Sequence, residues 1–119
     1  MVNLDGLDNR SEILDSWPGP ITWVLPKKLG VPSWLSGQNK GIAVRISAHP
    51  IVSALCKKTG ILLSTSANPT GQRPAKNASQ VRNYFGNSVD FIYPGITEGA
   101  QQPTEIRDAI SGRILRKAG

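Results

Sequence analysis

Apolar residues follow two spacings along the chain, and helical spacing is the clearer of them. Between His49-Pro50 and Gly60, apolar residues recur three and four positions apart, and Gly60 supplies a C-cap. Residues 11–16 predict a short helix with Ser11 as its N-cap. The helix must end there, because the prolines that follow cannot continue its hydrogen-bond ladder. A further short helix is predicted over about residues 79–85, ended by Gly86.

Alternating or continuous apolar runs predict short strands over residues 21–25, 41–46, 61–63, 91–93, 104–109 and 113–116. The run 61–63 directly follows a helix and is expected to be a strand buried on both faces of a sheet. Glu105 and Arg107 share one face of the run 104–109 and Ile106 the other, which predicts an edge strand. Because helices and strands interleave, we expect an α/β fold, or α+β under stricter schemes, with helices packed on a sheet.

Length and composition are those of one soluble globular domain over residues 1–119. Hydrophobic residues make up 39% and charged residues 18%, which excludes disordered, collagen-like and coiled-coil proteins. No apolar run is long enough to span a bilayer and no signal-peptide pattern opens the chain, so a cytoplasmic protein without a membrane partner is expected. One cysteine, Cys56, and one histidine, His49, exclude a disulfide or zinc framework, and no metal site is predicted. We expect Cys56 in the core and His49 in a capping or packing role.

Charge is distributed unevenly around a formal net charge of +6. Residues 1–15 hold one Arg against four Asp and Glu, a net of −3, whereas residues 16–119 hold 13 Lys and Arg against four acids, a net of +9. The basic part is expected to attract anions such as a nucleotide or a nucleic acid. Trp17, Trp23 and Trp34 lack the spacing of an RNA-recognition sheet and are expected in the core.

Three small polar residues, Ser64, Ser66 and Asn68, follow the predicted strand 61–63. Side chains alternate along an extended chain, so Ser64 and Ser66 point the same way, and Asn68 either continues the row or turns back to hold the loop. Ligands of open sheets bind outside the carboxyl ends of strands, so one hypothesis is that these groups face a ligand. The alternative is that they only end a strand and begin a turn.

Two arginines near strand ends are candidates for binding an anion. Arg45 ends an apolar strand, where its guanidinium either binds a carboxylate or phosphate, reaches the surface, or pairs with an acid such as Asp108. Arg116 poses the same choice, with a solvated cation near the chain end as its alternative. Thr104 follows the long loop 94–103, which is a candidate lid.

Four segments carry a family resemblance: residues 16–25 (SWPGPITWVL), residues 43–45 (AVR) before His49-Pro50, residues 64–68 (STSAN) with Gly71, and residues 104–108 (TEIRD). In order and spacing, over nearly the whole chain, they closely resemble the YrdC-like threonylcarbamoyl-AMP synthases. The resemblance implies a twisted mixed sheet flanked by helices around a basic cavity.

The resemblance also implies a reaction in which L-threonine, bicarbonate and ATP condense to threonylcarbamoyl-AMP and pyrophosphate. This is the first step toward threonylcarbamoyladenosine (t6A) at position 37 of tRNA, so tRNA and later t6A-synthesis proteins are expected partners. Carried across, the threonine-binding residues are Arg45, Ser64 and Thr104, and the ATP-binding residues are Ser66, Asn68 and Arg116. No protein nucleophile or base is expected, because the threonine carbamate itself attacks the α-phosphate, and Mg²⁺ would be carried by the ATP phosphates.

The chain departs from the family pattern before Trp17. The family's Pro-Thr-Glu-x-x-Tyr-Gly-Leu segment and its phosphate-gripping Lys-x-Arg motif have no counterpart there. We therefore expect a domain truncated at its N-terminus, with little or no synthase activity by itself. Loss of central strands would expose an apolar sheet edge, so a homodimer through that edge is a further hypothesis.

A different class of function also fits the charge. The +9 region would serve a binding module for double-stranded RNA or tRNA without catalysis, although no recognised RNA-binding motif is present. A third reading is an inactive remnant or regulatory subunit that needs a partner chain. Steeply salt-dependent RNA binding would favour the RNA module, and stoichiometric ATP binding would favour the enzyme.

Overall fold

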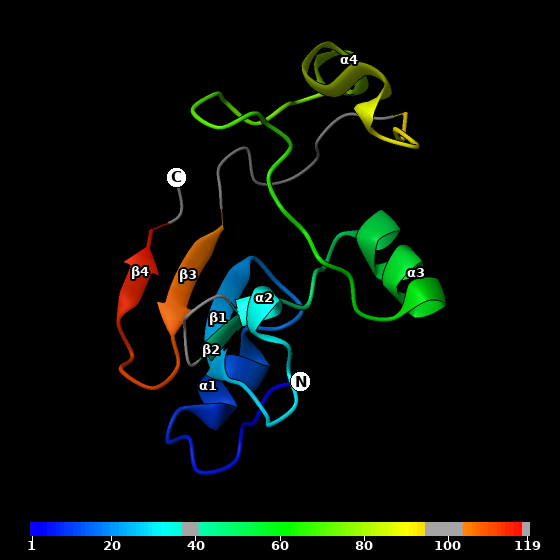
Figure 1. Cartoon of the computed structure of the whole chain (residues 1–119). Helices are drawn as coiled ribbons and strands as arrows, with labels where there is room; N and C mark the ends of the chain where they lie inside the picture. Colours follow the sequence, from blue (N-terminus) through cyan, green and yellow to red (C-terminus); the bar gives the residue numbers. More distant parts are fainter. Residues whose placement is uncertain (37–40, 95–103, 118–119) are drawn as a thin grey trace. The chain divides into compact units, whose positions relative to one another are not determined.

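The computed structural model describes residues 1–36, 41–94 and 104–117, which fall into two compact units (Figure 1). The first unit comprises Met1–Gly60 and Gln102–Gly119, and the second comprises Ile61–Gln101. The helices are α1 (Arg10–Asp15), α2 (Ser33–Ser36), α3 (Pro50–Thr59) and α4 (Ala78–Phe85), with a 3₁₀ turn, η1 (Gly86–Ser88). The strands are β1 (Ile21–Pro26), β2 (Gly41–Val44), β3 (Glu105–Asp108) and β4 (Ile114–Arg116). The prediction of one domain over residues 1–119 stays a prediction.

The first unit is built on a mixed four-stranded sheet with the order β2-β1-β3-β4 (Figure 1). β1 runs antiparallel to β2 and parallel to β3, and β4 returns antiparallel to β3 through a turn that contains Gly112. The expected mixed sheet is thus confirmed. The edge-strand prediction for 104–109 is wrong, because β3 has a neighbour on each side. A consequence for the site is that β1 and β3 begin, and β2 and β4 end, at one edge of the sheet.

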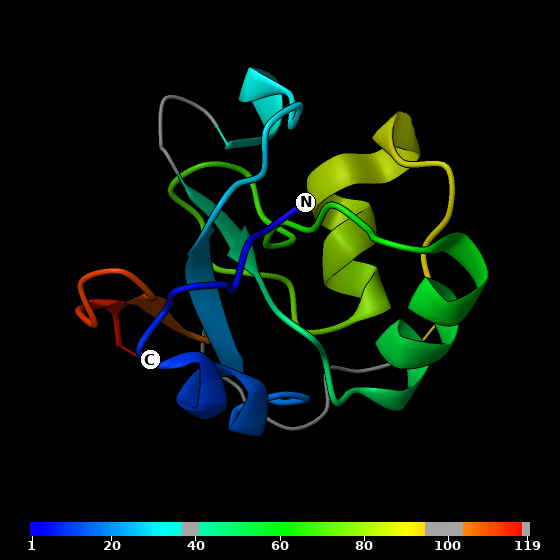
Figure 2. The same ribbon diagram turned by 90° about the horizontal axis from the view of Figure 1, so that it is seen from below.

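Helix α1 covers one face of this sheet and closes the core (Figure 2). Ile13 of α1 is buried with Trp23, Leu25 and Ala109. Trp23 and Leu25 are two residues apart on β1, so they project to the same face, toward the helix. The loop before α1 adds Val2, Leu4 and Leu7 around this core.

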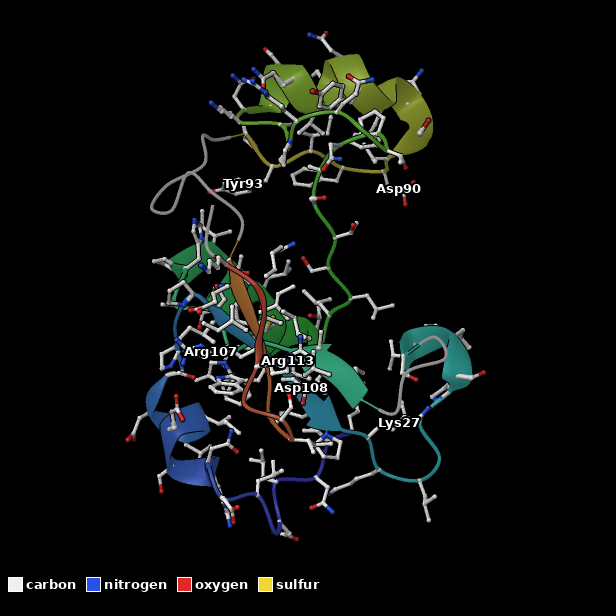
Figure 3. All side chains as sticks on the ribbon, turned by 90° about the vertical axis from the view of Figure 1, so that its left-hand side faces the viewer. Lys27, Asp90, Tyr93, Arg107, Asp108 and Arg113 are labelled. Carbon is white, nitrogen blue, oxygen red and sulfur yellow. The ribbon has the colours of Figure 1, made fainter. Side chains whose placement is uncertain are left out.

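Arg107 of β3 links the sheet to α1 by an ion pair, and its guanidinium lies over the ring of Trp23 (Figure 3 labels Arg107). Its Nη1 donates to Glu12 of α1 at 3.1 Å and its Nη2 to Glu105 at 3.2 Å. The guanidinium carbon lies 5.6 Å from the centroid of the Trp23 ring, within the range of a cation–π interaction. Arg107 is therefore explained by the packing of α1 on the sheet.

Capping explains where the longer helices begin and end. His49 Nδ1 accepts the backbone N–H of Ile51 at 3.3 Å, and Gly60 follows α3 with φ 83°, which favours glycine. The predicted helix and the capping role of His49 are confirmed. Helix α4 is also confirmed, within one residue of the predicted start. Ser11 as an N-cap is wrong, because α1 begins one residue earlier with Asn9 at its N-cap and Ser11 lies inside the helix.

The predicted strands over 61–63 and 91–93 are wrong. Neither segment is a strand, and Ile61, Leu62 and Leu63 are 77%, 42% and 71% exposed. A strand needs a neighbour to pair its backbone groups, and no described segment pairs with either run. β2 also ends at Val44, two residues before the predicted end, because the carbonyl of Ile46 accepts the N–H of Gly19 instead of joining the ladder.

Two predictions of burial are also wrong. Cys56 is only half-buried on α3, a helix without a fully buried residue. Trp34 is 73% exposed beside the loop that follows β1, whereas Trp23 is buried and Trp17 packs against the core. The apolar stripe of α3 has the spacing of a core helix, but none of its residues reaches the core of the first unit.

Candidate functional site

Four polar side chains lie at the edge of the first unit's sheet where β1 and β3 begin and β2 and β4 end. Arg45 directly follows β2, Thr22 is the second residue of β1, Thr104 directly precedes β3, and Arg116 ends β4. The parallel register sets Ile21 opposite Glu105, and the antiparallel register sets Ile106 opposite Arg116. The pairing of the strands therefore brings Arg45, Thr104 and Arg116, three of the six predicted site residues, to the same edge.

Arg116 is held against Thr104. Its Nε and Nη2 donate to the backbone carbonyl of Thr104 at 3.2 and 2.9 Å. This two-point contact orients the guanidinium plane, and Nη1 has no partner among the described residues. Arg116 is exposed near the chain end, as the alternative of a solvated cation expects, but it is also anchored and still has a donor to offer, so its role as a ligand-binding residue stays a prediction.

Thr22 belongs to this edge and was missed by sequence reasoning. Its Oγ1 lies 3.4 Å from Oγ1 of Thr104, so two hydroxyl groups sit side by side across the β1–β3 pair. A signal was present, because Thr22 is a polar residue between Ile21 and Trp23 in an apolar strand. Only the parallel pairing of β1 with β3, which joins segments 82 residues apart, reveals its neighbour.

Arg45 is exposed and leans on the backbone of the loop before β1. Its Nη1 donates to the carbonyl of Gly19 at 3.4 Å, a long contact. Pairing with Asp108 is wrong, because neither ion pair among the described residues includes Arg45 or Asp108. Asp108 Oδ1 instead accepts the backbone N–H groups of Ile110 at 2.8 Å and Ser111 at 3.2 Å in the β3–β4 turn. Arg45 forms no ion pair with any described residue, so its guanidinium keeps most of its capacity to bind an anion.

The second unit carries the other three predicted residues in one short segment without regular secondary structure. Ser64 and Ser66 are exposed, and the carbonyl of Ser66 accepts the N–H of Asn68 at 3.0 Å. Asn68 is half-buried and donates Nδ2 to the carbonyl of Pro69 at 3.0 Å. Its Oδ1 is buried without a hydrogen-bond partner in the described part of the chain. A buried acceptor without a donor is costly, so a hydrogen bond to this oxygen would be favourable wherever a donor could reach it.

A tight turn fixes the end of this segment. Pro69 accepts the N–H of Gln72 at 3.0 Å, and Gly71 has φ 84°, as the third position of a type II turn requires. Ala75 then donates its N–H to the carbonyl of Ala67 at 2.8 Å. The hypothesis that Asn68 turns back to hold the loop is supported by its bond to Pro69.

The predicted residues therefore form two groups, one in each unit. The first unit brings together Arg45, Thr104 and Arg116, and the second unit holds Ser64, Ser66 and Asn68 on five consecutive residues. The convergence of the two groups on one ligand stays a prediction. Of the candidate lid, residues 95–103 lie outside the described residues.

The chemistry of these groups is recognition of anions and hydroxyl groups. They offer guanidinium and hydroxyl donors and an amide acceptor. In residues 1–36, 41–94 and 104–117, no three His, Cys, Asp or Glu side chains gather where they could hold a metal ion. Over the same residues, no helix has the length and apolar character needed to cross a membrane.

A family model and curated relatives match the chain over most of its length. The family model Sua5/YciO/YrdC, described as "Telomere recombination", matches residues 7–118. A threonylcarbamoyl-AMP synthase of Halorhodospira halophila is 50% identical over 103 residues, which are 86% of this chain and 54% of the relative. One from Xanthomonas euvesicatoria is 47% identical over 118 residues, 97% of this chain and 63% of the relative. The chain thus spans little more than half the length of these curated relatives.

Solved structures of P. abyssi Sua5 share the fold. A variant of that protein matches with a TM-score of 0.85 and 28% identity, over 97% of this chain and 37% of the other. The same protein complexed with L-threonine matches with a TM-score of 0.84 and 28% identity, over 97% of this chain and 35% of the other. The YrdC-like α/β fold expected from the sequence is confirmed by these matches together with the mixed sheet. The chain belongs to the Sua5/YciO/YrdC family.

Proposed function

We propose that this chain acts in an L-threonylcarbamoyladenylate synthase, which makes threonylcarbamoyl-AMP and pyrophosphate from L-threonine, bicarbonate and ATP. The observation that carries the proposal is 50% identity over 103 residues to a relative named threonylcarbamoyl-AMP synthase. The chain spans 54% of that relative, so the activity of the whole enzyme is carried over as part of the proposal. The structural neighbour that was solved with L-threonine supports threonine as one substrate.

For the threonine side, we assign Arg45, Thr104 and Ser64. A planar guanidinium matches a carboxylate in a two-point contact, and Arg45 has no competing acid among the described residues. The hydroxyl of Thr104 would bind a polar group of the amino acid, with Thr22 beside it at 3.4 Å to fix its rotamer. Ser64 is exposed and free to contribute a further hydroxyl.

For the ATP side, we assign Ser66, Asn68 and Arg116. Asn68 offers a buried acceptor oxygen, which suits a donor such as a ribose hydroxyl or an adenine amino group. Arg116 keeps Nη1 for a phosphate oxygen while its other donors hold it on Thr104. Mg²⁺ is proposed to arrive with the ATP phosphates, because Mg²⁺ at such sites binds largely through substrate phosphates and water.

The reaction needs alignment and charge more than a reactive side chain. Threonine and bicarbonate first form a carbamate with loss of water. A carbamate oxygen then bonds to the α-phosphorus as the bond from that phosphorus to the bridging oxygen of pyrophosphate breaks. Cations placed along the phosphates stabilise the charge that develops there.

The contact between Arg116 and Thr104 supports this division of roles. The carbamate and the α-phosphate must meet for the reaction, so residues that bind threonine and residues that bind ATP must be neighbours somewhere. Within the first unit, the proposed threonine residue Thr104 and the proposed ATP residue Arg116 are joined by hydrogen bonds of 2.9 and 3.2 Å.

The ATP assignment is tested by Arg116→Ala, with Arg113→Ala as the matched control on the same hairpin. A charge-assisted hydrogen bond contributes about 1.5–3 kcal/mol, so Arg116→Ala should weaken ATP binding at least about tenfold, as measured by calorimetry in about 150 mM salt. Arg113→Ala, which removes the same charge, should change the affinity less than about threefold. Equal losses in both variants would show that only the overall positive charge attracts ATP and would contradict the assignment.

The cellular role follows from the product. We propose that threonylcarbamoyl-AMP is consumed in t6A modification of tRNA in the cytoplasm, with later t6A-synthesis proteins as partners. The alternative of an RNA-binding module without catalysis is favoured by one observation, a pocket in the second unit whose lining includes Arg73 and Lys76.

A further inference from the structure

A groove in the first unit lies where the chain leaves β1, and none of the proposed threonine and ATP residues lines it. It has a volume of about 440 Å³, within the about 300–1,000 Å³ typical of ligand pockets. Met1 and the segment 28–35, apart from Ser33, line this groove. The polar edge of the sheet lies where β1 begins, whereas the segment 28–35 follows Pro26, the last residue of β1. The groove and the polar edge are therefore at opposite ends of β1.

Hydrogen bonds hold the parts of the chain that form this groove. The N–H of Lys28 donates to the carbonyl of Met1 at 2.9 Å, which fixes the start of the chain beside the end of β1. Lys27 Nζ donates to Oγ of the buried Ser36 at 2.9 Å, which ties α2 to the same end of β1 (Figure 3 labels Lys27). The groove is thus formed before a partner binds, so little ordering is needed on binding.

Two large apolar side chains of the groove are exposed. Leu29 is fully exposed at a turn, and Trp34 is 73% exposed on α2. Neither belongs to the core around Trp23. Exposed apolar side chains that line one groove mark an interaction surface, because a partner that covers them removes apolar surface from water. Tryptophan is also enriched among the residues that contribute most to protein–protein affinity.

The charge of the groove indicates the chemistry of its occupant. Lys28 is exposed and is the charged residue of the lining. It forms no ion pair within the described part of the chain, and no described acidic residue lines the groove. A carboxylate next to the apolar side chains of a partner would complement this ammonium group. The groove therefore suits an occupant that is both apolar and acidic.

A lipid surface is a poorer match than a protein. Segments that bind anionic lipids carry clusters of about four to eight basic residues. In the described segment 26–36 the basic residues are Lys27 and Lys28, and Lys27 is turned toward Ser36. One ammonium group is enough to pair with one carboxylate of a peptide, whereas it gives little attraction to a membrane.

We propose that this groove docks a segment of a partner protein in which one or two bulky apolar side chains stand beside an aspartate or glutamate. The apolar side chains pack on Trp34 and Leu29, and the carboxylate pairs with Lys28. The docked segment leaves the polar edge of the sheet open, and the proposal does not depend on the proposed synthase function.

The test selects binders from a display library of random peptides of about 12 residues on the immobilised 119-residue chain. Selected peptides are then synthesised with a fluorescent label and titrated in about 150 mM salt. Trp34→Ser removes the exposed ring, and Phe91→Ser is its matched control, because Phe91 is an aromatic residue that is 76% exposed outside the groove. Lys28→Glu reverses the charge of the groove, and Lys58→Glu on α3 makes the same change elsewhere.

The selected peptides are expected to combine bulky apolar residues with Asp or Glu. Their affinity should fall at least about tenfold in Trp34→Ser and at least about fivefold in Lys28→Glu. It should change less than about twofold in Phe91→Ser and Lys58→Glu. Circular dichroism would show that each variant is folded.

Three results would overturn the proposal. The first is that no peptide is enriched, or that the enriched peptides bind the native chain and Trp34→Ser equally. The second is binding to vesicles with about 30% phosphatidylserine that is lost in Trp34→Ser while no peptide binds, which would assign the groove to a membrane. The third is a dimer in sedimentation velocity that Trp34→Ser dissociates while no peptide binds, which would assign the groove to a second copy of the chain.

Discussion

Arg45, Thr104 and Arg116 show what one residue's place in a sheet contributes to a site. Arg45 and Arg116 could be chosen from the sequence because each stands at the end of an apolar run, whereas Thr104 was chosen from the family resemblance. The sequence could not decide between a ligand and a salt bridge for Arg45. The structure excludes a salt bridge with Asp108, because neither ion pair among the described residues includes Arg45, whereas ligand binding by Arg45 stays a prediction. Thr22 was missed because its partner is 82 residues away.

Thr104→Val tests the hydroxyl at this edge. The substitution keeps the size of the side chain and leaves the backbone carbonyl that holds Arg116, while it removes the group 3.4 Å from Thr22. A hydrogen bond contributes about 0.5–1.5 kcal/mol, so the affinity for L-threonine should fall about 3- to 10-fold. Thr70→Val, at an exposed position of the second unit, is the control and should leave that affinity unchanged. An unchanged affinity in Thr104→Val would remove Thr104 from the threonine site.

At the scale of elements, helical spacing and the glycines that end the helices predicted α3 and α4, whereas the N-cap of α1 was wrong, α2 was not predicted, and apolar runs predicted the strands only in part. α3 and α4 begin after His49 and Asn77, whose side chains accept backbone N–H groups, and these signals are local. Whether an apolar run becomes a strand depends on a neighbour. β1 pairs with β2 and β3, whereas the run 61–63 pairs with no strand in the described chain, although its composition is as apolar as that of β1.

The packing of α1 on the sheet is tested by Ile13→Ala, with Leu14→Ala as the neighbouring control. Ile13 is fully buried against Trp23, so its truncation should leave a cavity and lower the free energy of unfolding by about 2–5 kcal/mol. Leu14 is 45% exposed on the same helix, and its truncation should cost about 1 kcal/mol or less. Urea unfolding with an unchanged slope measures both. Equal costs would show that α1 does not seal the core.

At the scale of the whole molecule, the family and the mixed sheet could be predicted because four motifs occur in order along nearly the whole chain. The convergence of the six predicted residues on one ligand stays a prediction, because three of them lie in each unit. The charge of +6 indicated an anionic ligand but not its position. The anchoring of Arg116 became visible only in the structure.

The homodimer predicted from the sequence, through an apolar edge exposed by the loss of central strands, also belongs to this scale, and β4 is our candidate for such an edge. β4 is an edge of the sheet, three residues long and exposed, and Ile114 and Leu115 are 48% and 54% exposed there. An unpaired apolar edge can add a strand from a second copy. Sedimentation velocity across a range of protein concentrations should therefore show a reversible dimer, and Leu115→Lys should shift it toward the monomer. A monodisperse monomer at every concentration would contradict the prediction.

Titration of L-threonine into the 119-residue chain, followed by calorimetry, tests the central claim most directly. The account predicts saturable binding with one site per chain, weakened at least about tenfold in Arg45→Ala by loss of the guanidinium–carboxylate contact. Binding should be unchanged in Arg10→Ala, which removes an exposed arginine of α1 in the same unit. No saturable heat, or equal affinity in the native chain and in Arg45→Ala, would contradict the account.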